Sequence, residues 1–167
     1  MSGFILDTDV LSELRRRTPN PALLRWLTKV SSEEVASTAI TVMEIRRGIE
    51  TARRANPGVA EAVEEWLSGI LDSGAPEILP LDVPAAQILG RMYAVPALRT
   101  FFTTSPAARQ PKTGADLAIA AIAISRQAVV VTNNVADFLA IQRHFPLPGL
   151  LNPFTGEWLV PAVAPGA

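Results

Sequence analysis

The sequence contains no cysteine and a single histidine, His144, among its 167 residues. The lack of cysteine excludes disulfides, thiolate nucleophiles and thiolate zinc sites. One histidine cannot build a metal site that needs several imidazoles. A catalytic site in this chain must therefore use carboxylates, hydroxyl groups, arginines or a metal ion that prefers oxygen ligands.

Long hydrophobic runs and a strong net charge are also missing. The longest apolar run, residues 117–124, is far shorter than the roughly 20 residues that a membrane helix needs. The N-terminus lacks the basic and apolar regions of a secretion signal, so we expect a cytoplasmic protein that does not enter a membrane. The net charge of -1 gives no overall attraction to nucleic acid. Arginines are instead clustered locally, at residues 15–17 and 46–47.

Short apolar segments alternate with segments of helical periodicity along the whole chain. The predicted strands are 3–6, 34–40, 77–82 and 128–134, with a further edge strand in 146–161, and the predicted helices are 8–17, 20–30, 41–54, 58–72, 83–94, 113–127 and 135–145. This alternation is typical of a parallel sheet covered by helices on both faces. The length favours one domain over residues 1–167, with 96–112 as an extended loop and a C-terminal tail from about residue 153.

Acidic and polar side chains recur where the predicted strands end. Asp7 and Asp9 follow the first strand, and Glu44 lies four residues after the second. Asp116 opens the most apolar helix, and residues 132–137 follow the late strand. The carboxyl ends of parallel strands meet at one edge of a sheet, where such folds keep their sites. We therefore expect these side chains to lie in one cleft.

Helix capping is the alternative interpretation of most of these acids. Thr41 with Glu44, and Thr113 with Asp116, both match the capping-box spacing. Asp9 or Thr8 is expected to cap the first helix rather than to bind metal. Asp7 is harder to explain by capping, because a carboxylate at the end of a buried strand requires a counter-charge or a metal ion.

Three acids that share one cleft repel one another and require a cation. Mg²⁺ or Mn²⁺ fits a site built from oxygen ligands without cysteine or several histidines. A carboxylate cluster that holds such an ion can activate water for attack on a phosphodiester. The arginine runs near the acids, at Arg15, Arg46 and Arg47, are candidate phosphate contacts, although such runs are also common on solvated faces.

Five segments, in this order and spacing, resemble the PIN domains, and among them the VapC-type and FitB-like toxins of bacterial toxin–antitoxin pairs. The segments are FILDTDVLSEL, TVMEIRRGI, GADLAIAAIAI, VVVTNNVADF and LLNPF. The resemblance implies a three-layer α/β/α sandwich with a mainly parallel sheet. It also implies a Mg²⁺- or Mn²⁺-dependent ribonuclease that cleaves RNA, pairs with a cognate antitoxin protein and forms a homodimer.

The resemblance assigns site roles to individual residues of this chain. Asp7 and Asp116 would be metal ligands, and Glu44 would complete the cluster or orient the attacking water. The fourth acid of the family usually stands two residues after the strand-ending threonine, Thr132, where this chain has Asn134. Asp137, three residues further on, is the alternative candidate, and either side chain would support a second ion or a metal-bound water.

Two other functions compete with a ribonuclease. LDTDV also fits the opening motif of haloacid dehalogenase-like phosphatases, but Lys29 and Lys112 both precede Thr132, and the acidic pair that such enzymes need beyond it is missing. The Asn134 position leaves open a catalytically inactive PIN fold that serves as a protein-binding module. Phe101 and Phe102, which are unusual in a solvated loop, indicate that residues 96–112 pack on a second subunit or on the antitoxin.

Overall fold

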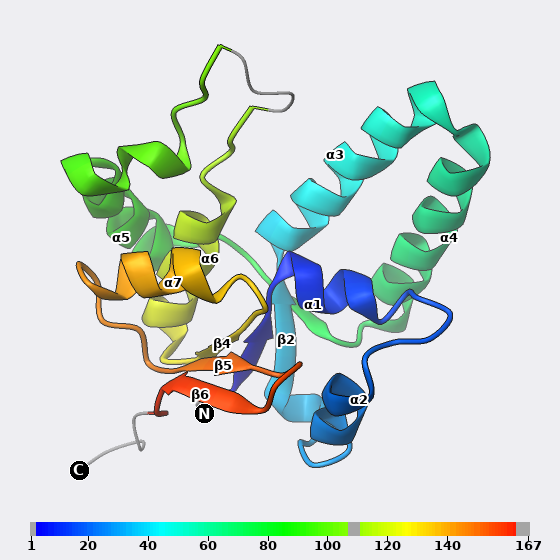
Figure 1. The fold of residues 1–167 in the computed structure, drawn as a ribbon, viewed down its shortest axis with the longest axis horizontal. Coiled ribbons are helices and arrows are strands. Elements are labelled where there is room, and N and C mark those ends of the chain that lie inside the picture. Colours follow the sequence, from blue (N-terminus) through cyan, green and yellow to red (C-terminus); the bar gives the residue numbers. More distant parts are fainter. Residues whose placement is uncertain (1–2, 107–110, 163–167) are drawn as a thin grey trace.

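The computed structural model describes residues 3–106 and 111–162 and has a six-stranded sheet at its centre (Figure 1). The strands are β1 (Phe4–Leu6), β2 (Val35–Thr38), β3 (Glu77–Leu79), β4 (Val129–Val131), β5 (Leu150–Asn152) and β6 (Glu157–Val160). They lie in the order β3-β2-β1-β4-β5-β6, and only the β5–β6 pair is antiparallel. The predicted edge strand near the C-terminus is therefore present, as β6.

Helices connect and cover the strands. They are α1 (Thr8–Glu13), α2 (Pro21–Leu27), η1 (Ser32–Glu34), α3 (Ala39–Ala55), α4 (Pro57–Ser73), α5 (Val83–Tyr93), η2 (Pro96–Phe101), α6 (Ala115–Arg126) and α7 (Val135–Gln142), where η marks a 3₁₀ helix. Figure 1 shows α5, α6 and α7 on one side of the sheet, and α3 and α4 as an antiparallel pair on the other. Within the described ranges, no helix is long and apolar enough to cross a membrane.

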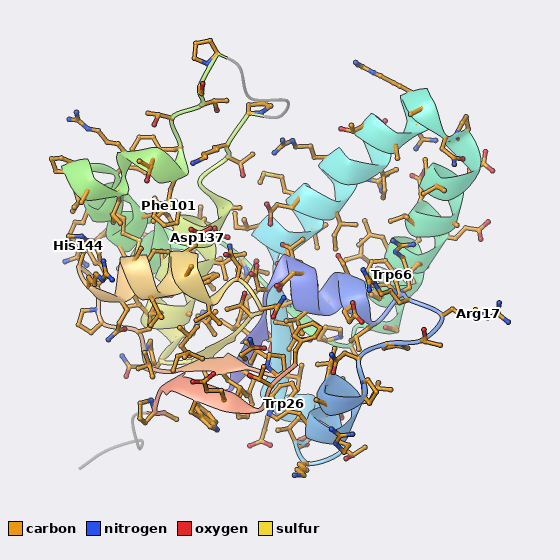
Figure 2. All side chains as sticks on the ribbon, in the orientation of Figure 1. Arg17, Trp26, Trp66, Phe101, Asp137 and His144 are labelled. Carbon is orange, nitrogen blue, oxygen red and sulfur yellow. The ribbon has the colours of Figure 1, made fainter. Side chains whose placement is uncertain are left out.

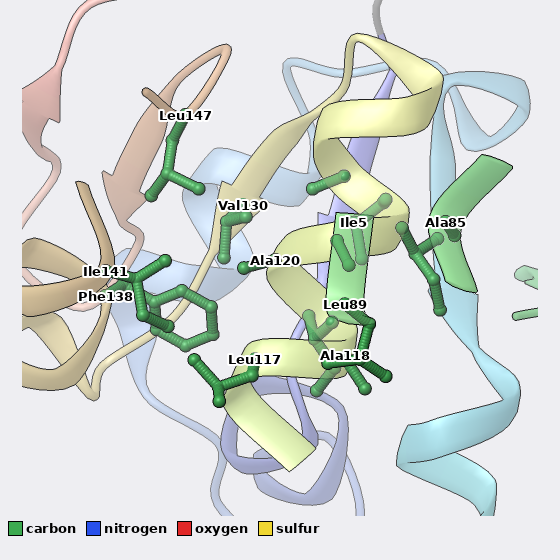
Figure 3. Close-up of a cluster of buried hydrophobic side chains, with 14 of the residues drawn as sticks. Ile5, Ala85, Leu89, Leu117, Ala118, Ala120, Val130, Phe138, Ile141 and Leu147 are labelled. Carbon is green, nitrogen blue, oxygen red and sulfur yellow. The ribbon is translucent and has the colours of Figure 1, made fainter. Parts of the chain in front are cut away.

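Alternate strand residues divide the hydrophobic core into two layers, because successive side chains of a strand point to opposite faces. Ile5 and Val130 face α5, α6 and α7, and Figure 3 shows this cluster around Leu117 and Phe138. Leu6, the neighbour of Ile5, faces the other layer, formed by α1, α2, α3 and α4. Helices on both faces of a mostly parallel sheet confirm the predicted three-layer α/β/α sandwich.

Two predicted segments differ from the structure. The first helix ends at Glu13 instead of residue 17, because Leu14 is its last apolar position and the arginines after it are exposed, with no core to stabilise another turn. Residues 96–112 are not irregular throughout, since Pro96–Phe101 forms η2. Phe101 and Phe102 pack against the protein's own core, so these side chains do not supply the exposed surface on which the predicted partner contact depends.

The strand order reverses beside β1, which lies between β2 and β4. The chain runs outward through β2 and β3, then returns to β4 on the other side of β1. This topological switch point separates the loops that follow β1 and β4 and is where open parallel sheets place ligands. The expectation of one domain over residues 1–167 stays a prediction, and residues 107–110 and 163–167 of its loop and tail lie outside the described residues.

Candidate active site

Asp7 lies at the switch point, directly after β1, and is only 4% exposed. One carboxylate oxygen accepts a hydrogen bond from the Thr8 N–H at 2.7 Å, and the other accepts one from the Thr132 hydroxyl at 2.8 Å. Thr132, at the end of β4, in turn accepts from the Asn134 N–H at 2.9 Å. The two central strand ends are therefore joined through one buried carboxylate.

Asp116 lies in the first turn of α6, the helix that covers the opposite face of the sheet from α1. Asn134 Nδ2 donates to Asp116 Oδ2 at 3.3 Å and to Asp137 Oδ2 at 2.9 Å. Asn134 thus holds the two carboxylates beside each other. Asp137 is exposed, whereas Asp116 is partly buried, so Asp116 has less access to water.

Glu44 joins the site from α3. The Thr8 hydroxyl donates to Glu44 Oε2 at 2.5 Å, which fixes the carboxylate beside the start of α1. The predicted capping role of Glu44 is wrong, because α3 starts at Ala39 and its N-cap is Thr38, whose hydroxyl oxygen accepts from the Thr41 N–H at 3.1 Å. Glu44 is therefore in the second turn of the helix.

Two further capping predictions are also wrong. The N-cap of α6 is Gly114, in a left-handed conformation with φ of 70°, and it makes no side-chain cap bond, so Asp116 is not part of a capping box with Thr113. Asp9 does not cap α1, because Asp7 occupies the N-cap. Asp9 instead accepts from the Asn133 N–H at 2.9 Å, and its other oxygen is buried without a hydrogen-bond partner.

Asp9 is a member of this acidic group that the sequence-based assignment left out. Its carboxylate ties α1 to the loop after β4, across 124 residues of sequence. The available signal was its position two residues after Asp7, beyond the same buried strand. Burial raises the pKa of Asp9 above its ordinary value, although backbone hydrogen bonds from Asn133 and its neighbours oppose the rise.

The electrostatics of the site favour a bound cation. Burial, with the added charges of Asp9 and Asp116, raises the pKa of Asp7 from 3.8 to about 8. Burial, with the charges of Asp137 and Glu44, raises the pKa of Asp116 to about 7. Both groups are therefore held in a place where ionisation is costly at neutral pH, and a positive ion beside them removes that cost.

The donor set fits Mg²⁺ or Mn²⁺. All its side-chain ligands are oxygens, and Mg²⁺ commonly keeps several waters and binds through one or two carboxylates. Within residues 3–106 and 111–162, no three acidic or histidine side chains are gathered closely enough to hold a metal ion by themselves. The charge of Asp116 nevertheless acts on Asp7, and two carboxylates lie within the one or two through which a hydrated Mg²⁺ is commonly bound.

The three candidate phosphate-binding arginines lie in different surroundings. Arg46 is directed to α4, where its guanidinium pairs with Glu64 at 2.6 Å and Glu50 at 3.8 Å. Arg47 lies on the cleft side of α3 and donates to the Pro111 carbonyl oxygen at 3.0 Å. Arg15 is exposed beyond the end of α1 and lines a groove that also includes Glu44. Of the three, Arg47 is the one that lines the same cleft as Asp116.

That cleft has a volume of about 340 Å³ and contains the carboxylates of Glu44, Asp116 and Asp137. Its other wall is formed by residues 100–101 and 111–114 and includes Lys112, which the sequence-based assignment missed. Phe101 and Asp137 both line this cleft, and Figure 2 shows them on the other side of the molecule from Arg17. His144 is exposed after α7 and does not line this cleft.

Comparison with known proteins agrees with this geometry. A family model for the PIN domain matches residues 4–142. Toxin FitB of Neisseria gonorrhoeae is 34% identical over 137 residues, 81% of this chain and 91% of that protein. VapC ribonuclease Y4jK of Sinorhizobium fredii is 29% identical over 144 residues, with coverages of 81% and 90%.

Among solved structures, the crystal structure of FitAcB from Neisseria gonorrhoeae superposes with a TM-score of 0.65. The sequence identity is 30%, and the match covers 90% of this chain and 98% of that one. The order of strands, the buried acid after β1 and the match over most of the length agree with one another. The chain therefore belongs to the PIN-domain family and is a relative of the FitB- and VapC-type toxins.

Proposed function

We propose that this protein is the toxin of a toxin–antitoxin pair and acts in the cytoplasm as a Mg²⁺- or Mn²⁺-dependent endoribonuclease. The observation that carries the proposal is the pair of buried or partly buried carboxylates, Asp7 and Asp116, which interact across the switch point of the sheet. The names of the related proteins, a toxin and a ribonuclease, support the same activity.

Asp7 and Asp116 would hold the metal ion. When bound, the ion would activate water and neutralise charge on the phosphodiester. Thr132 and the Thr8 N–H keep the Asp7 carboxylate in a single orientation, and Asn134 does the same for Asp116. This support matters because a site is useful only when its ligands are fixed by their neighbours.

Glu44 has a different task in this proposal. Its carboxylate is held by the Thr8 hydroxyl, faces the cleft and has a second oxygen that can accept a hydrogen bond from the attacking water. Such orientation converts a mobile water into one aligned for in-line attack. Asp137 and Asn134 close the group on the α7 side and would retain a second hydrated ion or a metal-bound water.

Cleavage of RNA by the free protein tests the activity. We expect cleavage with Mg²⁺ or Mn²⁺, none with EDTA, and a loss of at least about 100-fold in Asp7→Asn and in Asp116→Asn, since either change removes a metal ligand. Asp72→Asn, an exposed substitution on α4, is the matched control. Full activity in both site variants would disprove the assigned site.

An inactive PIN fold that works as a binding module remains the second candidate, and the observation in its favour is Asn134 at the fourth acidic position. Purified wild-type protein that cleaves no RNA at any Mg²⁺ or Mn²⁺ concentration, yet binds the antitoxin, would support it. The partners that belong to the main proposal are an antitoxin protein and a second copy of this chain. Co-purification with the product of a neighbouring reading frame, and the mass of the free protein in solution, test these two partners.

A further inference from the structure

The wall of the cleft opposite the carboxylates is held in place by contacts with neighbouring helices. Phe101, at the end of η2, accepts the Gly114 N–H at 3.1 Å through its carbonyl oxygen. The ring of Phe102 packs edge-on against Tyr93 of α5, with centroids 4.7 Å apart. Residues 96–102 are therefore anchored to α5 on one side and to the start of α6 on the other.

Gly114 makes this close packing feasible. A Cβ at that position would lie 3.2 Å from the Tyr93 hydroxyl and 3.4 Å from Phe102 Cβ, and φ at residue 114 is +70°. Both the space and the backbone angle favour glycine there. The backbone between the wall and Asp116 therefore makes a tight turn at Gly114. Lys112 comes just before this turn, four residues ahead of Asp116 in the sequence.

Lys112 is fixed over the cleft by two hydrogen bonds. Its backbone N–H donates to the Thr104 hydroxyl at 2.8 Å, and its ammonium donates to the Thr100 carbonyl oxygen at 2.5 Å. A carbonyl oxygen orients the ammonium without neutralising it, and an ammonium has three N–H donors. Lys112 therefore presents a full positive charge at a defined place in the cleft that Asp116 and Glu44 also line.

Lys112 differs from the arginines of the α3–α4 helix pair in whether an acid compensates its charge. Arg46 and Arg53 both contact Glu64 at 2.6 Å, so an acid already compensates their charges. In the part of the chain that the structure describes, Lys112 makes no ion pair with an acid. Within this cleft its charge is thus available to an anionic ligand, and a phosphate is the anion that every RNA nucleotide supplies.

We infer that Lys112 binds a phosphate of the RNA strand next to the cleaved bond, and that residues 96–102 and 111–114 form the wall that positions the strand against the carboxylates. The inference rests on the proposed function and adds a substrate-binding residue to it. The Arg47 guanidinium, bonded to the Pro111 carbonyl at 3.0 Å, ties this wall to α3 and narrows the cleft from the other side. Lys112 contacts the backbone of the RNA, so it would act on all base sequences alike.

The test compares Lys112→Met, Lys112→Arg and Lys29→Met. Lys29 is the other lysine of the chain, is exposed outside the cleft, and its replacement changes the net charge by the same amount. The probe is a short mixed-sequence single-stranded RNA with a fluorescent label, and binding is followed by anisotropy in EDTA over a range of salt concentrations. Thermal unfolding of each variant checks that it is folded.

We expect Lys112→Met to weaken binding about tenfold at low salt, the size of one charged hydrogen bond. The slope of log affinity against log salt should fall by about 0.7, the value for one phosphate contact with a single strand. Lys112→Arg should restore both, and Lys29→Met should leave both unchanged. In cleavage assays Lys112→Met should raise KM and leave kcat near the wild-type value.

A salt slope for folded Lys112→Met equal to those of the wild type and Lys29→Met would overturn the inference, since a merely structural role does not alter counterion release. If that result came with normal RNA cleavage, the nuclease function would stand and only the role of Lys112 would be rejected. RNA binding that depends on Lys112 but comes without any cleavage would instead support the phosphate contact and reject the nuclease function. A wild-type protein that binds no RNA would overturn both.

Discussion

Replacing Asp7 with Asn should stabilise the metal-free protein at neutral pH. Because burial raises the pKa of Asp7 from 3.8 to about 8, the native state binds more protons than the unfolded state between these values. The free energy of unfolding of the wild type therefore falls as pH rises through this interval and levels off above about pH 8. Asparagine does not titrate, so the variant escapes this loss.

The expected size follows from the pKa shift and the local hydrogen bonds. A pH of 7 lies about 3 units above the ordinary Asp7 pKa of 3.8. At roughly 1.4 kcal/mol per unit, the loss of unfolding free energy in the wild type has an upper limit of about 4 kcal/mol. The amide also offers an N–H to the Thr132 hydroxyl where the carboxylate offered an acceptor, which costs about 1 kcal/mol. The net stabilisation at pH 7 should be about 1 to 3 kcal/mol.

Urea unfolding in EDTA at pH 4.5 and pH 7 measures this effect. At pH 4.5 the unfolded chain is close to its own Asp7 pKa of 3.8, so taking up a proton on folding costs little and the advantage of Asp7→Asn should shrink or reverse. Asp72→Asn is the matched control, because the same change on an exposed side chain should produce less than about 0.5 kcal/mol of difference between the two pH values. If Asp7→Asn is less stable than the wild type at pH 7, or if its advantage is equal at both pH values, the raised pKa of Asp7 would be refuted.

Other expectations concern the same region. Mg²⁺ at 100 times its dissociation constant should raise the wild-type unfolding free energy by about 2.7 kcal/mol and Asp7→Asn by much less, as calorimetry with and without EDTA would reveal. Thr132→Val keeps the side-chain shape but removes the donor to Asp7, and should cost about 1–3 kcal/mol in urea unfolding. Gly114→Ala should destabilise more than Gly74→Ala, because both have positive φ but only the former meets Tyr93, and equal unfolding midpoints would contradict this.

The sequence predicted the layers of the fold well because periodicity is a local property. The apolar run at 129–131 and the helical spacing of residues 39–55 each reflect one element facing one core. The first residues of the helices were harder to predict from the sequence. Thr38 pairs with Leu79 in the sheet and caps α3 at the same time, so the helix begins at Ala39, two residues before the predicted start at Thr41.

The candidate site was predictable to the extent that it depends on strand ends. Asp7, Glu44 and Asp116 come together because β1 and β4 are neighbours and α3 and α6 begin at the same edge. The sequence could not tell Arg46 from Arg47, because adjacent helix positions point about 100° apart and only the placement of α4 decides which one meets Glu64. Asp9 was misassigned for a similar reason, since its partner is 124 residues away.

The chemical class of the site follows from the amino-acid composition. Without cysteine and with one histidine, the chain can build a metal site almost entirely from oxygen ligands, and the acids that follow apolar strands are expected at one sheet edge. The tertiary structure decided which groups are buried, paired or free to meet a ligand. Burial and charge pairing depend on contacts between distant segments, so the strain on Asp7 and the position of Lys112 over the cleft exist only in the folded chain.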